Sequence, residues 1–317
     1  MTAEGIGSRA TGSWYEVING IEKINCRIRG KLRLKGVRST NPVVVGDVVR
    51  CQSDQNGEWV IYAIVPRRNY IIRRASNLSK ESHIIAANID RAMIVVTLIE
   101  PVTALEFVDR FLITCEAYKV PATILLAKID LLAESPEAVA HFHEIYESAG
   151  YEVIDISATE GIGIERVKSM LDGKVTLISG NSGVGKSTLV GKIDPTLDIR
   201  TGEISESFHK GKHTTPFSTM YPIGQGGYII DTPGIKGFGL IEIDDKELWH
   251  YFPEMIATAG ECRFYNCTHT HEPGCAVVEA VKEGRISYSR YESYLKILDD
   301  DDKYRKKSHH RAIQGAH

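Results

Sequence analysis

The sequence predicts a multi-domain protein in which a small N-terminal β-barrel precedes a central α/β domain and a C-terminal helical domain. Between about residues 12 and 74, short alternating segments separated by Gly and Pro are typical of a small antiparallel barrel or sandwich. Apolar strands then alternate with amphipathic stretches, which indicates βαβ units and a mostly parallel sheet. Beyond about Leu240, helical segments surround a cluster of cysteines. A chain of 317 residues has room for two or three such domains.

We place the domain boundaries where composition and periodicity change. The barrel takes residues 1–75, the α/β domain residues 76–240 and the helical domain residues 241–300. Residues 301–317 form a charged tail that we expect to be disordered, because its charge blocks are too dense to bury. In the last helix Ser287 is a candidate cap, and one face is predicted to carry Tyr288, Tyr291, Leu295 and Leu298.

The barrel region is basic, whereas the rest of the chain is acidic. Residues 1–75 carry 13 Lys and Arg against 6 Asp and Glu, although the whole chain has a formal charge of -3. The positive charge concentrates in residues 26–38 and 66–76, and fits either a phosphate-backbone contact or a solvated strand face. No apolar run approaches the roughly 20 residues of a membrane span, and no signal-peptide pattern opens the chain. We expect a soluble cytoplasmic protein that binds no membrane.

The six cysteines fall into two groups. Three are scattered, and we expect them to be reduced core residues: Cys26, Cys51 and Cys115. The other three lie within 14 residues, a clustering that suggests a metal site.

The clustered cysteines have the spacing Cys262-x4-Cys267-x-His269-x5-Cys275. Three thiolates and one imidazole make the ligand set of one closed, structural Zn²⁺ site, which leaves no position for catalytic water. His271 is the competing imidazole, and three core cysteines without metal are the alternative.

The strongest single motif is GNSGVGKST, residues 180–188. It lies between an apolar strand and a predicted helix, the context of a P-loop whose N–H groups and helix start bind phosphate. Lys186 is predicted to neutralise the β- and γ-phosphates, and the Ser187 hydroxyl to bind Mg²⁺. The other predicted nucleotide contacts of this loop are Asn181, Ser182, Gly183, Val184, Gly185 and Thr188.

Three further motifs define an unusual order. YIIDTPG, residues 228–234, and GKHTTPFSTMY, residues 211–221, follow the P-loop and offer Mg²⁺ and γ-phosphate contacts. ILLAKIDLL, residues 124–132, looks like a base-reading strand end, and Ser157-Ala158 follows the next strand. Both of these precede the P-loop, whereas in most GTPases they come after it. The order is therefore that of a circular permutation.

This arrangement resembles the ribosome small-subunit-dependent GTPase A family, RsgA or YjeQ. The segments that carry the resemblance are IAANIDRAMIVVT, GNSGVGKSTL, GKHTTP, DTPGIKGFGL and CRFYNCTHTHEPGCAV. The resemblance implies an oligonucleotide-binding (OB-type) barrel, a circularly permuted P-loop GTPase domain and a zinc domain. It also implies GTP hydrolysis stimulated by the small (30S) ribosomal subunit, binding to rRNA and a role in late maturation of that subunit. We expect a monomer.

The resemblance also assigns the base-reading residues. Asp130 would accept hydrogen bonds from guanine N1 and N2, Lys128 would lie along the base, and the N–H of Ala158, beside Ser157, would meet guanine O6. Ala127 departs from the family pattern, which has an asparagine that bonds the base or braces the P-loop. The methyl group makes neither contact, so we expect weaker binding of GTP and GDP.

The remaining assignments concern Mg²⁺ and the γ-phosphate. Thr215 is the expected switch threonine on Mg²⁺, with Thr214 as the alternative. Asp231 would hold Mg²⁺ from the outer shell, and Gly234 would sense the γ-phosphate. Ile235 follows where many GTPases have a glutamine that orients the attacking water, so another group must orient it or hydrolysis is slow without a partner.

Three functions are compatible with these motifs. The favoured one is a ribosome-stimulated GTPase with a low intrinsic rate. The second is a nucleotide-responsive RNA-binding scaffold whose hydrolysis is negligible, or whose guanine binding is weakened by Ala127. The third is an ATP-using P-loop enzyme, against which Asp130 argues.

We predict that His213 orients the attacking water once rRNA has ordered its loop. His213→Ala is then expected to lower turnover in the presence of small subunits. The measurement is steady-state GTP hydrolysis with and without purified subunits. Stimulated turnover equal to that of the parent would mean that His213 is an exposed loop residue without a chemical role.

Overall fold

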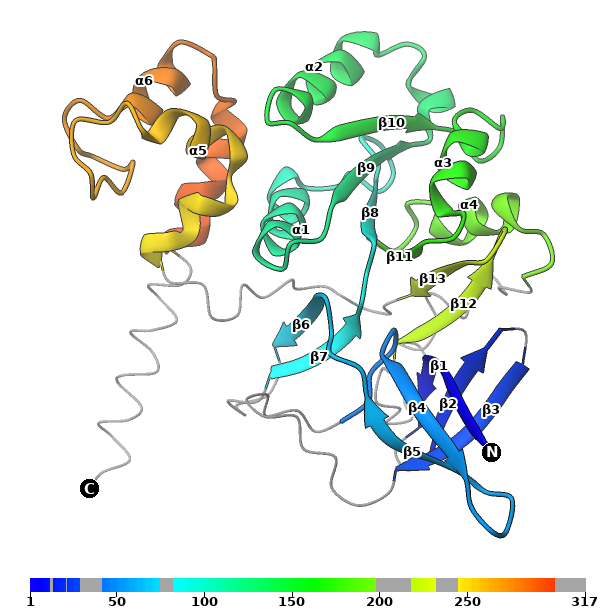
Figure 1. The fold of residues 1–317 in the computed structure, drawn as a ribbon. Coiled ribbons are helices and arrows are strands. Elements are labelled where there is room, and N and C mark those ends of the chain that lie inside the picture. Colours follow the sequence, from blue (N-terminus) through cyan, green and yellow to red (C-terminus); the bar gives the residue numbers. More distant parts are fainter. Residues whose placement is uncertain are drawn as a thin grey trace, which may run out of the picture.

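Eleven strands form one continuous sheet in the computed structural model of this protein (Figure 1). The structure describes residues 1–11, 14–20, 22–28, 42–74, 82–197, 218–231 and 245–299. The predicted tail and most of the basic segment of residues 26–38 lie outside these ranges. No helix among the described residues is long and apolar enough to cross a membrane.

The first five strands close into the predicted barrel. Their spatial order is β1-β2-β3-β5-β4, and β4 pairs back onto β1. Only the β3–β5 contact is parallel, and this closed five-stranded order is that of an OB-type barrel. The strands are β1 (Thr2–Ala10), β2 (Tyr15–Asn19), β3 (Glu22–Ile28), β4 (Val48–Ser53) and β5 (Trp59–Ile64).

The scattered cysteines are buried free thiols, as predicted. Cys26 and Cys51 lie in the barrel core, with their sulfur atoms 3.6 Å apart. Cys115 packs between helix and sheet in the central domain, where burial and the nearby Glu116 raise the pKa of its thiol. All three therefore act as small apolar core residues.

A hairpin and a buried ion pair connect the barrel to the rest of the chain. The hairpin consists of β6 (Tyr70–Arg74) and β7 (Ser82–Ala87). Beside it, the buried Asp47 accepts bonds of 2.6 and 2.7 Å from the guanidinium of Arg67. Gly46 has a φ of +88°, and a Cβ there would come within 2.0 Å of the Ala87 carbonyl oxygen. The barrel is thus fixed to the start of the α/β domain by close backbone contact.

The central domain is a mostly parallel sheet covered by helices on both faces. Its strand order is β10-β9-β8-β11-β13-β12, and only β12 is antiparallel. Alternate strand residues point to opposite faces, where they pack against α1 and α2 or against α3 and α4. The strands are β8 (Arg91–Val96), β9 (Ala122–Ala127), β10 (Glu152–Ile156), β11 (Val175–Gly180), β12 (Thr219–Ile223) and β13 (Gly227–Asp231). The helices are α1 (Leu105–Ala117), α2 (Pro136–Glu147), α3 (Ile164–Leu171) and α4 (Lys186–Ile193).

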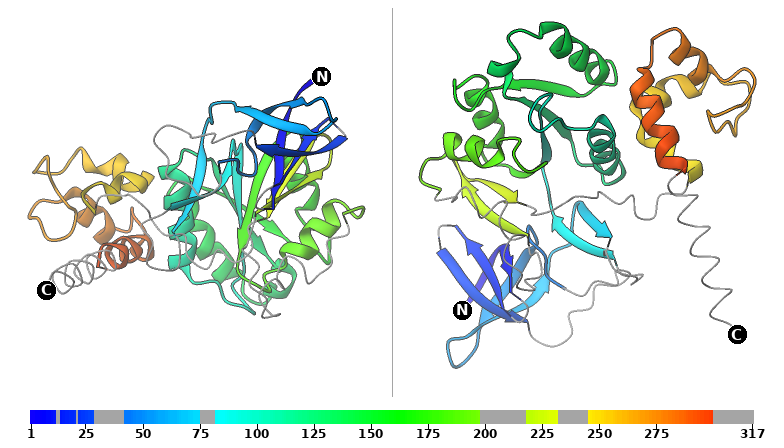
Figure 2. Two further views of the ribbon diagram at one scale, coloured as in Figure 1. Left: turned by 90° about the horizontal axis from the view of Figure 1, so that it is seen from below. Right: turned by 180° about the vertical axis from the view of Figure 1, so that it is seen from behind.

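The C-terminal part is helical and packs beside α1. It contains η3 (Asp245–Tyr251), α5 (Pro253–Ala259), α6 (Ala276–Lys282) and a last helix at residues 288–299. Figure 2 shows that this part and the barrel lie on different sides of the α/β domain. The C-terminal part contacts it through α1 and η3, and the barrel through β1 and β12.

The buried face of the last helix differs from the expected one. Tyr291 and Leu298 pack inward as predicted, but Tyr288 and Leu295 are exposed. Tyr294 and Ile297 take their places in the core. Compared with the prediction, the buried face is turned about the helix axis, because it also contains Arg290. Hydrophobic periodicity could not predict a buried arginine.

The Arg290 guanidinium joins three elements that are distant in sequence. It donates at 2.8 Å to Asp109 of α1, and at 2.8 and 3.2 Å to Glu254 of α5, with all three side chains buried. The ring of Phe252 lies 4.9 Å from it. Burial disfavours the charged guanidinium, but the two carboxylates outweigh burial and raise the pKa of Arg290 well above its ordinary value. This buried cluster holds the C-terminal part against the α/β domain.

We expect Arg290→Met to lower the free energy of unfolding by about 3 to 5 kcal/mol, because it leaves two buried carboxylates without their cation. The measurement is urea denaturation followed by circular dichroism. The matched control is Arg285→Met, because Arg285 pairs with Glu283 on the surface, and such a pair contributes about 0 to 1 kcal/mol. Equal effects of the two substitutions would contradict this role for Arg290.

Candidate nucleotide site and metal centre

The predicted nucleotide contacts gather at one edge of the parallel sheet. The carboxyl ends of parallel strands meet at a common edge, where ligands bind in open α/β folds. In register, Gly180 lies opposite Val95, Ile178 opposite Asp231, and Ile156 opposite Ala127. The P-loop, the Lys128 turn, the Ser157 loop and the end of β13 therefore share this edge, although about 100 residues separate them along the chain.

The P-loop is formed as its glycines predict. Gly180 has a φ of +144°, and a Cβ there would come within 2.5 Å of the Val95 carbonyl oxygen, so only glycine fits. The side chain of Val184 is buried and anchors the loop in the core below it. Lys186 begins α4, and its ammonium donates bonds of 2.7 Å to the carbonyl oxygens of Gly180 and Asn181. The lysine charge thus lies inside the loop, at a helix start, where phosphate binds.

The other predicted P-loop residues lie in the same turn or in the first turn of α4. Ser182, Gly183 and Thr188 are exposed, whereas Gly185 and Ser187 are partly buried. Gly183 and Gly185 have φ values of +84° and +101°, which glycine adopts without strain.

A loop that sequence reasoning missed connects the P-loop to the base-reading turn. Lys128 follows β9 in the left-handed region, with a φ of 60°, and its ammonium donates to the carbonyl oxygen of Glu100. Pro101 lies on the other side, where its ring is 3.5 Å from the position of a Cβ on Gly183. The only feature of the sequence that indicated this loop was the proline in TLIEPVT, just after an apolar strand.

Asp130 is held by the loop that follows β10. Asp130 lies in η1 (Ile129–Leu132), and the Thr159 hydroxyl donates to its carboxylate at 3.4 Å. The hydroxyls of Thr159 and the buried Ser157 are 2.9 Å apart, and the Glu160 N–H donates to Ser157 at 3.1 Å. Ser157 therefore braces the loop that carries Ala158. Thr159 had no predicted role, because its position opposite Asp130 depends on the pairing of β9 with β10.

Ala127 ends β9 beneath this corner. Its methyl group is 5% exposed and belongs to the core cluster that also contains Val184 of the P-loop. The position thus lies between the base-reading turn and the phosphate-binding loop.

Several predicted residues cannot be located in this geometry. His213, Thr214, Thr215, Gly234 and Ile235 lie outside the described residues. Asp231 is the last residue of β13, beside β11, and only its backbone is described.

Cys262, Cys267, His269 and Cys275 form a second candidate site. Their ligand atoms all lie within 4.8 Å of one another. The sulfur atoms of Cys262 and Cys275 are 4.0 Å apart, and His269 Nδ1 lies 3.6 and 3.5 Å from them. Tetrahedral zinc, with bonds of about 2.3 Å to sulfur and about 2.0 Å to nitrogen, requires spacings close to these. The four residues therefore fit one zinc ion.

The pKa shifts of the Cys267 thiol and the His269 imidazole are also consistent with a bound cation. Burial raises the pKa of the Cys267 thiol to about 12, so several thiolates would be stable together only with a positive charge between them. Burial lowers the pKa of His269, which favours the neutral imidazole that binds metal. His271, the competing imidazole, is exposed, and its Nδ1 lies 2.8 Å from the Thr270 hydroxyl.

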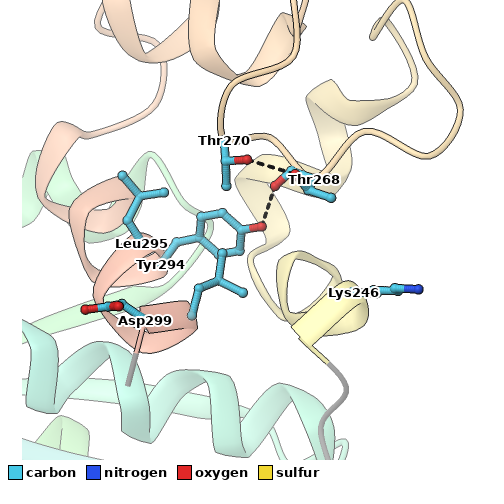
Figure 3. A pocket seen from close by; sticks show the side chains of 7 residues that line it. Lys246, Thr268, Thr270, Tyr294, Leu295 and Asp299 are labelled. Carbon is cyan, nitrogen blue, oxygen red and sulfur yellow. Dashed lines mark hydrogen bonds between the residues drawn. The ribbon is translucent and has the colours of Figure 1, made fainter. Parts of the chain in front are cut away.

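Residues around the cluster hold its loop in shape. The Tyr291 and Tyr294 hydroxyls donate to the carbonyl oxygens of His269 and Thr268, at 2.9 and 2.6 Å. Figure 3 shows Tyr294 reaching Thr268 across a pocket beside this loop. Glu272 accepts bonds from the Thr268 hydroxyl and from the backbone N–H groups of Thr268 and Thr270. These donors, the hydroxyl foremost, outweigh burial and lower the pKa of Glu272. Glu272 and Tyr294 escaped sequence reasoning. Tyr291 was predicted on the helix face but not as a donor to this loop, because its partner is a backbone atom.

The fold and the nucleotide edge together define a circularly permuted P-loop GTPase. The strands that carry the base-reading turns, β9 and β10, come before the P-loop strand β11, and the Asp231 strand β13 comes after it. Comparison with known proteins identifies the family. The model of the RsgA GTPase matches residues 64–241, and the model of the RsgA N-terminal domain matches residues 4–61. The chain belongs to the RsgA GTPase family and is a GTPase of that family.

Individual relatives are similar over nearly the whole chain. A "Small ribosomal subunit biogenesis GTPase RsgA 2" from Bacteroides thetaiotaomicron is 50% identical, over 95% of this chain and 99% of its own length. A "Small ribosomal subunit biogenesis GTPase RsgA" from Porphyromonas gingivalis is 51% identical, over 94% and 97%. Among solved structures, YjeQ from Thermotoga maritima matches with a TM-score of 0.76 and 33% identity, over 95% of this chain and 98% of that one. YloQ, described as a circularly permuted GTPase, matches with a TM-score of 0.72 and 25% identity, over 96% of each chain.

We expect purified protein to carry one zinc ion per chain and His269→Ala to lose most of it. The measurement is metal content by inductively coupled plasma mass spectrometry. His271→Ala is the matched control and should keep the ion, because its imidazole is exposed and outside the cluster. Loss of zinc from the His271 variant alone would overturn the ligand assignment.

We expect Ala127→Asn to tighten GTP and GDP binding by about 5- to 150-fold, because an amide there restores one or two buried hydrogen bonds. Isothermal titration calorimetry with both nucleotides provides the measurement. Ala133→Asn adds the same amide at an exposed position a few residues away and should leave affinity unchanged. Unchanged affinity in the Ala127 variant would refute the interpretation.

Proposed function

We propose that this protein hydrolyses GTP when stimulated by the small ribosomal subunit, and that it acts in the late maturation of that subunit. The observation that carries the proposal is the shared sheet edge, where the P-loop with Lys186 and the turn of Lys128 and Asp130 both follow the carboxyl ends of parallel strands. Relatives named for biogenesis of the small ribosomal subunit, about 50% identical over most of the chain, support the choice of partner.

In this proposal each group at the edge has one task. The Lys128 and Asp130 turn and the Ala158 N–H select guanine, while Lys186 and the P-loop N–H groups hold the phosphates. Mg²⁺ bound with the nucleotide would neutralise charge between the β- and γ-phosphates. Its candidate ligands are Ser187 and Thr215, or Thr214 instead, with Asp231 in the outer shell.

The γ-phosphate end of the site depends on the segments after the P-loop. Gly234 would sense the γ-phosphate, and His213 would orient the attacking water. Since Ile235 replaces the usual glutamine, the intrinsic rate should be low until the ribosomal partner orders the His213 loop.

The barrel provides a candidate RNA contact. The Arg27 guanidinium lies 4.2 Å from the centroid of the Trp14 ring, and both side chains are partly exposed. Trp14 is in the β1–β2 loop and Arg27 on β3, the region through which OB folds bind single-stranded nucleic acid. A base can stack on such an aromatic and guanidinium pair. This pair supports an rRNA-binding role for the barrel.

The proposal also covers the role of zinc and the place where the protein acts. Zinc would have a structural role only, since the cluster offers four protein ligands and so fills a tetrahedral shell. We place the protein in the cytoplasm as a monomer that acts on ribosomal particles. The scaffold without hydrolysis remains a second candidate, because Ala127 removes a contact between base and P-loop.

We expect small subunits to stimulate GTP turnover strongly at about 50 mM salt and much less at about 200 mM, because basic contacts to phosphate weaken with salt. Basal turnover without subunits should not change with salt.

Trp14→Ala should weaken the stimulation by subunits about 5-fold or more, because one stacked base is lost. Tyr62→Ala removes another exposed aromatic residue of the barrel and should leave the stimulation unchanged. Turnover that subunits leave unchanged would instead support the scaffold.

A further inference from the structure

The loop between the first two ligand cysteines presents aromatic side chains to solvent. Tyr265 is 102% exposed, as much as in an extended peptide, and Phe264 is 40% exposed. The Arg263 guanidinium lies 5.4 Å from the Phe264 ring centroid. A single exposed aromatic residue is ordinary, but two adjacent exposed rings at one loop tip form a small continuous apolar patch, and such patches mark binding sites.

The loop that carries these rings is fixed at both ends. Its first residue, Cys262, donates its N–H to Ala259 at 3.1 Å, and Cys267 donates to the Phe264 carbonyl oxygen at 3.2 Å. The Arg263 N–H donates at 3.1 Å to Gly274, which precedes the last ligand cysteine. Both ends of the loop thus belong to the metal cluster. A rigid loop loses little conformational entropy on binding, so the exposed ring is already placed for a partner.

The size and surroundings of this tip decide what it can bind. Only the two aromatic rings are apolar, and polar residues flank them, including Glu261 and Asn266. A stable protein interface buries about 1,200 Å² or more, far beyond two rings. A single unpaired nucleotide base matches one tyrosine ring in area, and aromatic faces are the usual platforms for such bases in RNA.

We infer that Tyr265 is a stacking site for one unpaired base of ribosomal RNA, with Arg263 of the same loop for the neighbouring phosphate. The inference rests on the proposed function, because it takes the RNA from the same ribosomal partner. It adds a second RNA contact, on the zinc domain, to the one proposed for the barrel. Since the tyrosine carries no charge, its contribution is independent of salt, unlike that of the basic barrel.

The first test is binding of the full-length chain to small subunits at several salt concentrations. Tyr265→Ala should weaken binding about 5-fold or more at every salt concentration, without changing the slope of log affinity against log salt. Tyr265→Phe keeps the ring and should bind as the parent does. Tyr288→Ala removes another exposed tyrosine, 68% exposed on the last helix, and is the matched control. Equal affinity of the parent and the Tyr265→Ala variant would overturn the inference.

The second test identifies the class of partner. Tyr265 is replaced by the photoreactive p-azidophenylalanine, and the complex with small subunits is irradiated. A cross-link to rRNA supports the inference, whereas cross-links to ribosomal protein alone overturn it. Metal content and basal GTP turnover, measured on the same preparations, should match the parent and so exclude misfolding of the zinc loop.

Failure of the inference and failure of the proposed function give different results. A parent chain that does not bind small subunits contradicts the proposed function. The same photoreactive variant is then irradiated with single-stranded RNA oligonucleotides. A cross-link at position 265 still supports base stacking, and its absence overturns it.

Discussion

The alignment of five parallel strands in the central sheet is the constraint on which the rest of the structure depends. Hydrogen-bonded register brings the ends of β8, β9, β10, β11 and β13 to one edge, so residues far apart in the chain share a site. Permutation changes the order in which these strands occur but not their neighbours. The nucleotide site is therefore preserved, while the chain ends move to places where a barrel and a helical C-terminal part can attach.

The barrel is attached through strand pairing, in addition to the buried pair of Asp47 and Arg67. β1 pairs with β12 at Arg9 and Thr219, and β12 pairs with β13. The strand that ends in Asp231 is thus one strand away from the barrel. The C-terminal part joins through the buried charges of Arg290, Asp109 and Glu254. A buried charge without its partner is costly, so the last helix is favoured in the orientation against α1 in which these three side chains meet.

The metal cluster and the last helix stabilise each other. Tyr291 and Tyr294 bond the backbone of the ligand loop, and the same helix carries Arg290. The loop of the candidate metal ligands is therefore linked to the α/β domain through one helix. Its exposed tip, at Tyr265, lies on a well-braced support, as a recognition residue requires.

The family resemblance implied the OB type of the barrel. The residues by themselves predicted a small barrel or sandwich, the parallel sheet, the P-loop, the permuted order and a cluster of three cysteines with His269 or His271. Each of these features depends on local spacing, such as Gly-x4-Gly-Lys or the alternation of apolar residues, and local spacing can be read directly from the sequence. Only the tertiary structure decided that Arg290 is buried and that Tyr288 and Leu295 face solvent. It alone revealed that Glu100 receives Lys128 and that Thr159 reaches Asp130. These contacts join residues on different strands or helices, and their partners are fixed by packing and register, which no local pattern encodes.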